Sequence, residues 1–97
     1  MIIAELTIFP TGEGVSVSRF VKEALKVIAG SGLKHQTGSM ATTIEAPDMK
    51  TLLRVIEQTH AAVARMGVKR IHIDLRIDHR LDKEATIASK LESLAKK

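Results

Sequence analysis

The longest regular pattern in the chain is a strict alternation of apolar and polar residues. Residues 71–78 read IHIDLRID, with isoleucine or leucine at each odd position and histidine or a charged residue at each even one. Because successive side chains of a β-strand point to opposite faces, this alternation predicts a strand with one buried and one polar face. Runs rich in β-branched residues predict three further strands over 2–10, 33–40 and 41–46.

Helical spacing of apolar residues predicts three helices between and after these strands. The stripes fall in 17–28, 49–65 and 83–97. We expect Ser16 or Ser18 to cap the first helix, Asp48 the second and Asp82 the third. Glycines at 30, 32 and 67 are placed to end the first two helices.

The resulting order is β-α-β-β-α-β-α, which predicts an α+β ferredoxin-like domain. In this split βαβ plan, βαββαβ, two helices cover one face of a four-stranded antiparallel sheet whose first and third strands are central. The last helix is an addition to the plan. The length of 97 residues suits a single domain over 1–97.

The plan leaves one sheet face without helices, and we call it the open face. It gathers a mixture of apolar and charged residues: Ile3, Glu5, Thr7 and Phe9 from the first strand, Thr43 and Glu45 from the third, and His72, Asp74, Arg76 and Asp78 from the fourth. Isolated carboxylates are costly to bury, and isoleucine and phenylalanine gain nothing in water. This mixture predicts self-association to a dimer or tetramer, with polar groups kept for a ligand or for ion pairs between subunits.

Composition narrows the function classes. The chain has no cysteine, which excludes disulfides and thiolate chemistry, and only two aromatic residues, which leaves little for stacking nucleic-acid bases. The net charge of +4 arises from residue 65 onward, where bases alternate with acids, and this does not resemble a phosphate-binding stripe. We expect no nucleic-acid or membrane partner, and the absence of a signal-like N-terminus predicts a cytoplasmic location.

Three segments resemble the small thiamine-binding, YkoF-like family: AELTIFPTG, GLKHQTGSMATTIEA and GVKRIHIDLRIDHRLD, with KLESL near the end. The resemblance implies ferredoxin-like domains that associate through their sheets. It also implies binding of thiamine or its hydroxymethylpyrimidine part. The chain departs from the family at Ala46, where glycine is common, and at Phe9 and Thr11.

The predicted ligand residues are Thr43 and Glu45, with Glu5 and Asp74 as further candidates and Ser39 as a weaker one. A carboxylate can neutralise the thiazolium cation of thiamine or pair with its exocyclic amine, and hydroxyls can bond the ring nitrogens. The same carboxylates could instead form cross-strand salt bridges to Arg70 or Arg76.

The sequence contains no motif that indicates catalysis, a metal site or a bound cofactor. It contains no G-x-S-x-G, H-E-x-x-H or Walker motif, and its four histidines lack ligand spacing. The expectation is a non-catalytic binding protein. The alternative is a regulatory or structural oligomerisation module, similar to amino-acid-sensing domains, with no thiamine ligand.

Overall fold

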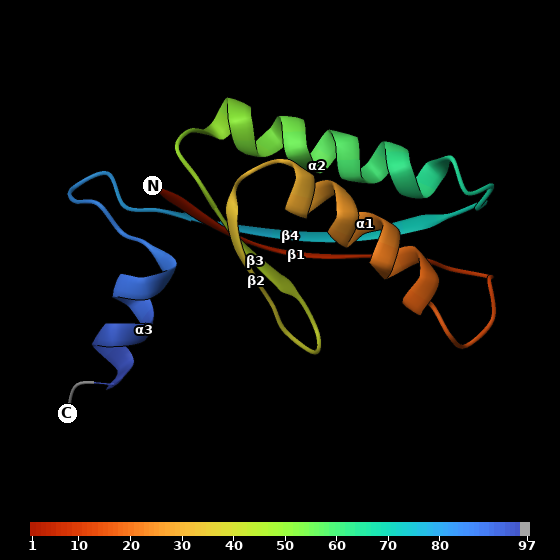
Figure 1. The fold of residues 1–97 in the computed structure, drawn as a ribbon, viewed down its shortest axis with the longest axis horizontal. Coiled ribbons are helices and arrows are strands. Elements are labelled where there is room, and N and C mark those ends of the chain that lie inside the picture. Colours follow the sequence, from red (N-terminus) through yellow and green to blue (C-terminus); the bar gives the residue numbers. More distant parts are fainter. Residues whose placement is uncertain (96–97) are drawn as a thin grey trace.

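The computed structural model describes residues 1–95 and contains the seven elements in the predicted order (Figure 1). They are β1 (Ile2–Pro10), α1 (Ser18–Gly30), β2 (Lys34–Thr37), β3 (Thr42–Ala46), α2 (Met49–Ala64), β4 (Ile71–His79) and α3 (Ile87–Ala95). The strands form one antiparallel sheet in the order β2-β3-β1-β4, with α1 and α2 side by side on one of its faces. The predicted ferredoxin-like fold with an added C-terminal helix is confirmed. Residues 96–97 of the predicted last helix lie outside the described residues.

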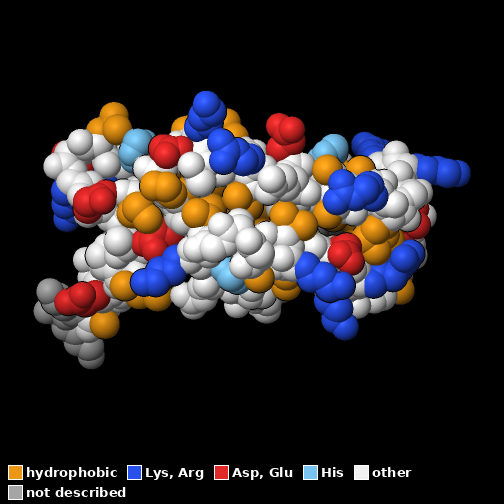
Figure 2. Space-filling view, turned by 45° about the horizontal axis from the view of Figure 1, so that its top comes forward, with side chains coloured by type: hydrophobic (Ala, Val, Ile, Leu, Met, Phe, Trp, Pro, Cys, Tyr) orange, Lys and Arg blue, Asp and Glu red, His pale blue; other side chains and the backbone are white. Residues whose placement is uncertain are grey.

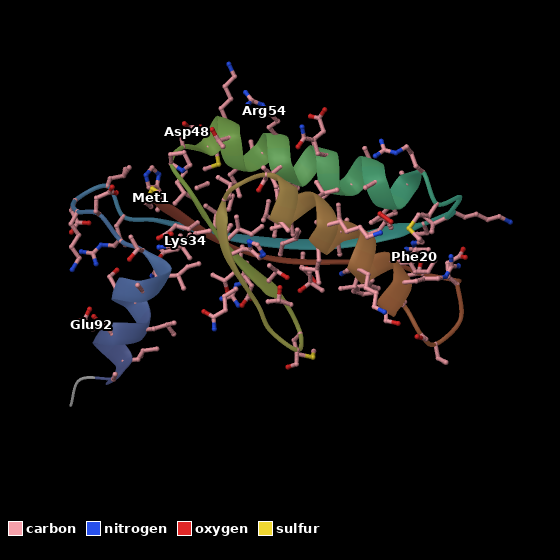
Figure 3. The ribbon with its side chains drawn as sticks, viewed as in Figure 1. Met1, Phe20, Lys34, Asp48, Arg54 and Glu92 are labelled. Atoms are coloured by element: carbon pink, nitrogen blue, oxygen red, sulfur yellow. The ribbon has the colours of Figure 1, made fainter. Side chains whose placement is uncertain are left out.

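The core lies between the sheet and these two helices. It is built from the apolar side chains that alternate along the central strands and from the inner stripes of the helices: Ile2, Ala4, Leu6, Ile8, Ile44, Ala46, Phe20, Ala24, Ile28, Leu52, Val55 and Val63. Phe20 lies where α1 meets the sheet (Figure 3). On β1 and β3 the alternation that predicted the strands also selects the buried face. The buried face predicted for β4 is wrong, because this strand lies at the sheet edge with Ile73 and Ile77 37% and 40% exposed and Ile71 and Leu75 only partly buried.

Strand register fixes which side chains share the open face. Glu5 lies opposite Thr43 on β3 and opposite Arg76 on β4, and Ile3 lies opposite Glu45. Directly opposed residues in an antiparallel pair point to the same side of the sheet. Glu5, Thr43 and Glu45 therefore lie on neighbouring central strands and on one face.

The side of the molecule that carries the helices shows charges of both signs mixed with hydrophobic side chains (Figure 2). No extended area of one sign dominates that view. The mixed-charge surface expected from the sequence is present there.

Two of the three predicted helix caps are wrong. Val17 occupies the N-cap of α1 without a side-chain bond, and the hydroxyls of Ser16 and Ser18 lie 3.4 Å from each other instead. Asp82 does not cap α3, because it pairs with Arg80. The start of α3 is instead fixed by Thr86 and Ser89.

Those two residues form a reciprocal capping pair. The Ser89 amide donates to the Thr86 hydroxyl at 3.0 Å, and the Thr86 amide donates to the Ser89 hydroxyl at 2.8 Å. Such pairs satisfy backbone donors that have no partner within the first helical turn. Asp82 was chosen on residue type alone, and helix α3 begins five residues later.

The cap of α2 is as predicted. The Asp48 carboxylate accepts a hydrogen bond from the Thr51 amide at 2.7 Å, at the N-terminal end of the helix (Figure 3). This bond to the charged form holds the pKa of Asp48 below its ordinary value of 3.8.

The lowered pKa makes the contribution of Asp48 to stability depend on pH. The contribution is present above the ordinary aspartate pKa and is lost as the pH falls through the lower folded-state value. We expect Asp48→Ala to lower the melting temperature at pH 7 and the difference from the native chain to shrink toward pH 2–3. Asp48→Asn, which keeps a cap acceptor, should stay close to the native chain at pH 7. Thermal unfolding of the three proteins at both pH values checks this, and an undiminished deficit of the alanine variant at low pH would contradict it.

Candidate functional site

Helix α3 covers part of the open face, and Glu45 holds its first turn. The side chain of Glu45 is only 4% exposed, and one carboxylate oxygen accepts a hydrogen bond from the Ile87 amide at 3.2 Å. An anion at a helix N-terminus is favoured by the unpaired backbone donors there. Glu45 therefore has a structural partner within the described chain, and a direct contact with a ligand would need α3 to shift.

Beside α3 the open face is hollowed, and we call this hollow the open-face groove. Its floor and wall are Ile3, Glu5, Thr43 and Lys90. These four residues line two adjoining hollows of about 300 and 370 Å³. Ile87 and Leu91 of α3 add apolar surface to the larger hollow. The groove thus combines apolar side chains with the Thr43 hydroxyl and the Glu5 carboxylate, and Arg76 and the Asp78–Lys90 ion pair line it as well. Apolar surface with a few polar groups is the usual makeup of a small-ligand site.

Two ion pairs line the groove, and the one that contains Glu5 is loose. Arg76 lies 3.8 Å from the Glu5 carboxylate, and its side chain is 85% exposed. Lys90 of α3 forms an ion pair with Asp78. The hydrogen bond from Lys90 holds the pKa of Asp78 below its usual value. A solvent-exposed pair such as Glu5–Arg76 contributes little, so the Glu5 carboxylate can exchange Arg76 for another cation at small cost.

Asp74 lies apart from this groove. Its carboxylate is 3.1 Å from the His72 ring nitrogen, and His72 packs on Phe9 with ring centroids 5.0 Å apart. Both Asp74 and His72 are exposed. The predicted pairing of carboxylates with Arg76 is therefore found for Glu5, whereas Asp74 pairs with the neighbouring histidine.

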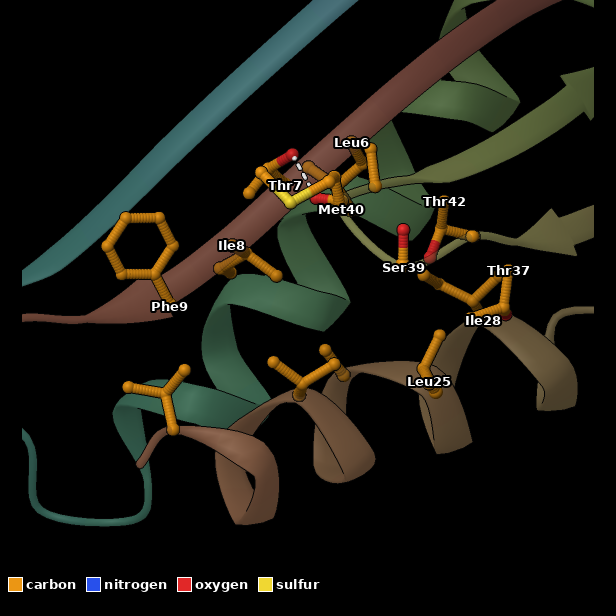
Figure 4. A pocket seen from close by; sticks show the side chains of 15 residues that line it. Leu6, Thr7, Ile8, Phe9, Leu25, Ile28, Thr37, Ser39, Met40 and Thr42 are labelled. Atoms are coloured by element: carbon orange, nitrogen blue, oxygen red, sulfur yellow. Dashed lines mark hydrogen bonds between the residues drawn. The ribbon is translucent and has the colours of Figure 1, made fainter. Parts of the chain in front are cut away.

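Ser39 lies on the other side of the sheet. It belongs to the turn between β2 and β3 and lines a cavity between this turn, β1 and α1 (Figure 4). Of the five predicted ligand residues, only Glu5 and Thr43 line the open-face groove together.

Sequence reasoning missed Thr42, whose side chain points into the cavity that Ser39 lines. The signal that could have found Thr42 is its pairing with Leu6. Leu6 belongs to the buried side of β1, so its partner Thr42 faces the helices as well.

The arrangement suits recognition of a small polar molecule. Within residues 1–95 no three histidine or acidic side chains are grouped as a metal site would need. None of the helices in that range is long and apolar enough to cross a membrane. What the groove does offer is a carboxylate and a hydroxyl directly opposite one another on the two central strands.

Fold and groove together define a small ferredoxin-like α+β binding domain. The model of the thiamine-binding protein family matches residues 4–95. The chain belongs to the thiamine-binding protein family.

Relatives in archaea and bacteria support this membership. A UPF0045 protein of Methanocaldococcus jannaschii is 39% identical over 93 residues, covering 96% of this chain and 91% of that protein. The UPF0045 protein YqgV of Bacillus subtilis is 39% identical over 101 residues, covering 99% and 96%. The chain is thus similar to these proteins over nearly its whole length.

Solved structures agree with the fold. A crystal structure of the Methanocaldococcus jannaschii protein matches with a TM-score of 0.90 and 38% identity, over 97% of this chain and 95% of that one. A Thermotoga maritima protein named for a suggested role in thiamine biosynthesis or salvage matches with a TM-score of 0.84, over 96% and 97%. Its identity of 19% means that this second likeness shows the fold alone.

Proposed function

We propose that the protein binds thiamine or its hydroxymethylpyrimidine part, without catalysis, in the open-face groove. The observation that carries the proposal is the opposition of Glu5 and Thr43 on β1 and β3 at the floor of this groove. A carboxylate complements the permanent charge of a thiazolium ring, and a hydroxyl can donate to or accept from an aminopyrimidine. Membership of the thiamine-binding family supports this ligand class.

In this proposal the other predicted residues have separate roles. Glu45 anchors α3 through the Ile87 amide, so that Ile87 and Leu91 form the apolar wall of the groove. Asp74 serves assembly, as argued below. Glu5 and Thr43 are the direct ligand contacts.

The test is a thermal-shift panel with thiamine, hydroxymethylpyrimidine and a set of amino acids. A ligand that binds only the folded state raises the melting temperature by mass action. At a ligand concentration of a hundred times its Kd, the free energy of unfolding increases by about 2.7 kcal/mol. We expect the first two compounds to raise the melting temperature and the amino acids to leave it unchanged. A response to amino acids alone would favour a sensing domain, and no response at millimolar concentrations would favour a purely structural module.

We also propose that the protein acts as a homo-oligomer assembled through β4. This strand is at the sheet edge, is nine residues long and keeps Ile73 and Ile77 37% and 40% exposed. Leu53 of α2 is exposed as well, although its place in the helical stripe predicts burial. A long edge strand with exposed isoleucines is a template for pairing with another chain.

The proposed contact between the two copies uses the full length of this edge. When two β4 strands pair antiparallel about a two-fold axis at Leu75, all nine residues of Ile71–His79 are covered. Asp74 then lies opposite Arg76 of the other copy, His72 opposite Asp78, and Ile73 opposite Ile77. Charge complementarity and apolar contact therefore favour the same register.

A further inference from the structure

A cavity of about 270 Å³ lies on the helix side of the sheet, and only the turn residues Gly38, Met40 and Ala41 line both this cavity and the open-face groove. Its walls come from α1, from β1 and from the turn between β2 and β3 (Figure 4). Most of the lining is aliphatic, including Leu6, Ile8, Val21, Leu25 and Ile28. Its volume is close to the lower end of the range of small-molecule sites, about 300–1,000 Å³.

The cavity exists because β3 is shorter than β1. The last residue of β1 that pairs with β3 is Leu6, so among residues 1–95 no strand pairs with the end of β1 from Thr7 onward on that side. Above this gap the N-cap Val17 and the α1 residues Val21 and Leu25 follow one another at intervals of four residues, and all three are only half-buried. The apolar stripe of α1 is thus longer than the sheet beneath it, and the space between them is left open.

One end of the cavity carries hydroxyl groups. Thr42 is only 7% exposed, and its hydroxyl makes no side-chain hydrogen bond among residues 1–95; it is not fully enclosed, since every fully buried side-chain oxygen or nitrogen in that range has a partner. Thr37 lies directly opposite Thr42 in the β2–β3 pair, and Ser39 is in the turn between them. Thr7 already donates its hydroxyl to the Met40 carbonyl at 3.2 Å. A threonine hydroxyl can both donate and accept a hydrogen bond, so the Thr42 hydroxyl is available to a polar group that enters the cavity.

The lining carries no ionisable side chain. All fifteen lining residues belong to the described chain, and none is lysine, arginine, histidine, aspartate or glutamate. Bringing a charge into such surroundings without a counter-charge is costly. The cavity therefore discriminates against cations and anions, in contrast to the open-face groove with Glu5.

We propose that this cavity is a second binding site, for an uncharged ring-sized molecule that carries one hydroxyl or amide group. The ring packs against the aliphatic side chains of α1 and β1, and the polar group hydrogen-bonds to Thr42. The site is independent of thiamine binding on the open face.

Benzyl alcohol is a suitable probe because two charged molecules share its ring. We expect it to cause saturable changes in the amide spectrum of the ¹⁵N-labelled chain at residues 6–8, 25–28 and 37–42. Benzylammonium and benzoate should cause no saturable change at these amides. Equal binding of all three molecules would overturn the proposal, as would the absence of a saturable change with the alcohol at 20 mM.

Two adjacent threonines provide a matched pair of variants. Thr42→Val removes the hydroxyl in the cavity and should weaken benzyl alcohol binding roughly two- to tenfold, the range for one neutral hydrogen bond. Thr43→Val makes the same change on the opposite face and should leave benzyl alcohol binding unchanged. Equal effects of the two substitutions would contradict a site built around Thr42.

Filling the cavity gives a second line of test. Val21→Phe adds volume from the half-buried side of α1 and should abolish the saturable changes, while the same amide spectrum reports whether the variant is folded. A folded variant that binds benzyl alcohol as the native chain does would overturn the proposal. Thiamine binding is measured separately, so failure at one site does not decide the other.

Discussion

An Asp74→Arg variant is expected to remain a monomer at concentrations at which the native chain is a dimer. In the register centred on Leu75, the substitution replaces two Asp74–Arg76 pairs between subunits with two pairs of like charge. Cross-strand charge pairs contribute about 0.2–1 kcal/mol each, and like charges cost a similar amount, so the dimer should lose about 1–4 kcal/mol. This corresponds to an at least roughly fivefold weaker association.

The reciprocal double substitution is the control for this register. Asp74→Arg combined with Arg76→Asp restores opposite charges across the two-fold axis and should restore the dimer. Light scattering at several micromolar concentrations distinguishes a mass near 10.6 kDa from twice that value. A native monomer would contradict the assembly proposal, and a double variant that stays monomeric would contradict the register.

Replacing Glu5 by glutamine is expected to weaken thiamine binding by roughly ten- to a hundredfold. The substitution keeps the shape of the side chain and removes its charge. Charge-assisted hydrogen bonds contribute about 1.5–3 kcal/mol, which is the basis of this range. The present partner of Glu5, Arg76, is largely exposed and 3.8 Å away, so the ligand can replace it. Calorimetric titration with thiamine measures the difference.

Two other carboxylates are matched controls for Glu5→Gln. Glu45→Gln keeps an acceptor for the Ile87 amide and should leave the affinity close to that of the native chain, because Glu45 lies beneath α3. Glu57→Gln changes an exposed residue of α2 and should have no effect. A loss confined to Glu45→Gln would transfer the ligand contact from Glu5 to Glu45 and would require α3 to move on binding.

The fold could be predicted from the sequence because local patterns and global topology agree. The alternation in residues 71–78 and the helical stripes gave the element order, and the ferredoxin-like plan is among the few topologies that this order allows. Prediction failed where a residue had two competing partners. Asp82 is a good cap by type, yet Arg80 binds it, and Thr86 and Ser89 start the helix instead.

The site was less predictable because it depends on where α3 lies. The strand pattern placed Glu5, Thr43 and Glu45 on one face, as the register shows. The strand pattern could not show that the Ile87 amide of α3 donates a hydrogen bond to the Glu45 carboxylate. The cavity beside Thr42 depends on where β3 stops pairing with β1; the bounds of both strands were predicted to within one residue, but their register was not.

The most direct test of the central claim is the mapping of thiamine onto the ¹⁵N-labelled native chain by amide chemical shifts. Binding in the open-face groove predicts saturable changes at residues 3–7, 43–45 and 87–91, with α1 and the outer face of α2 unaffected. The absence of saturable changes with millimolar thiamine and hydroxymethylpyrimidine would contradict the proposed function. Changes confined to α1 would contradict the open-face groove as its site.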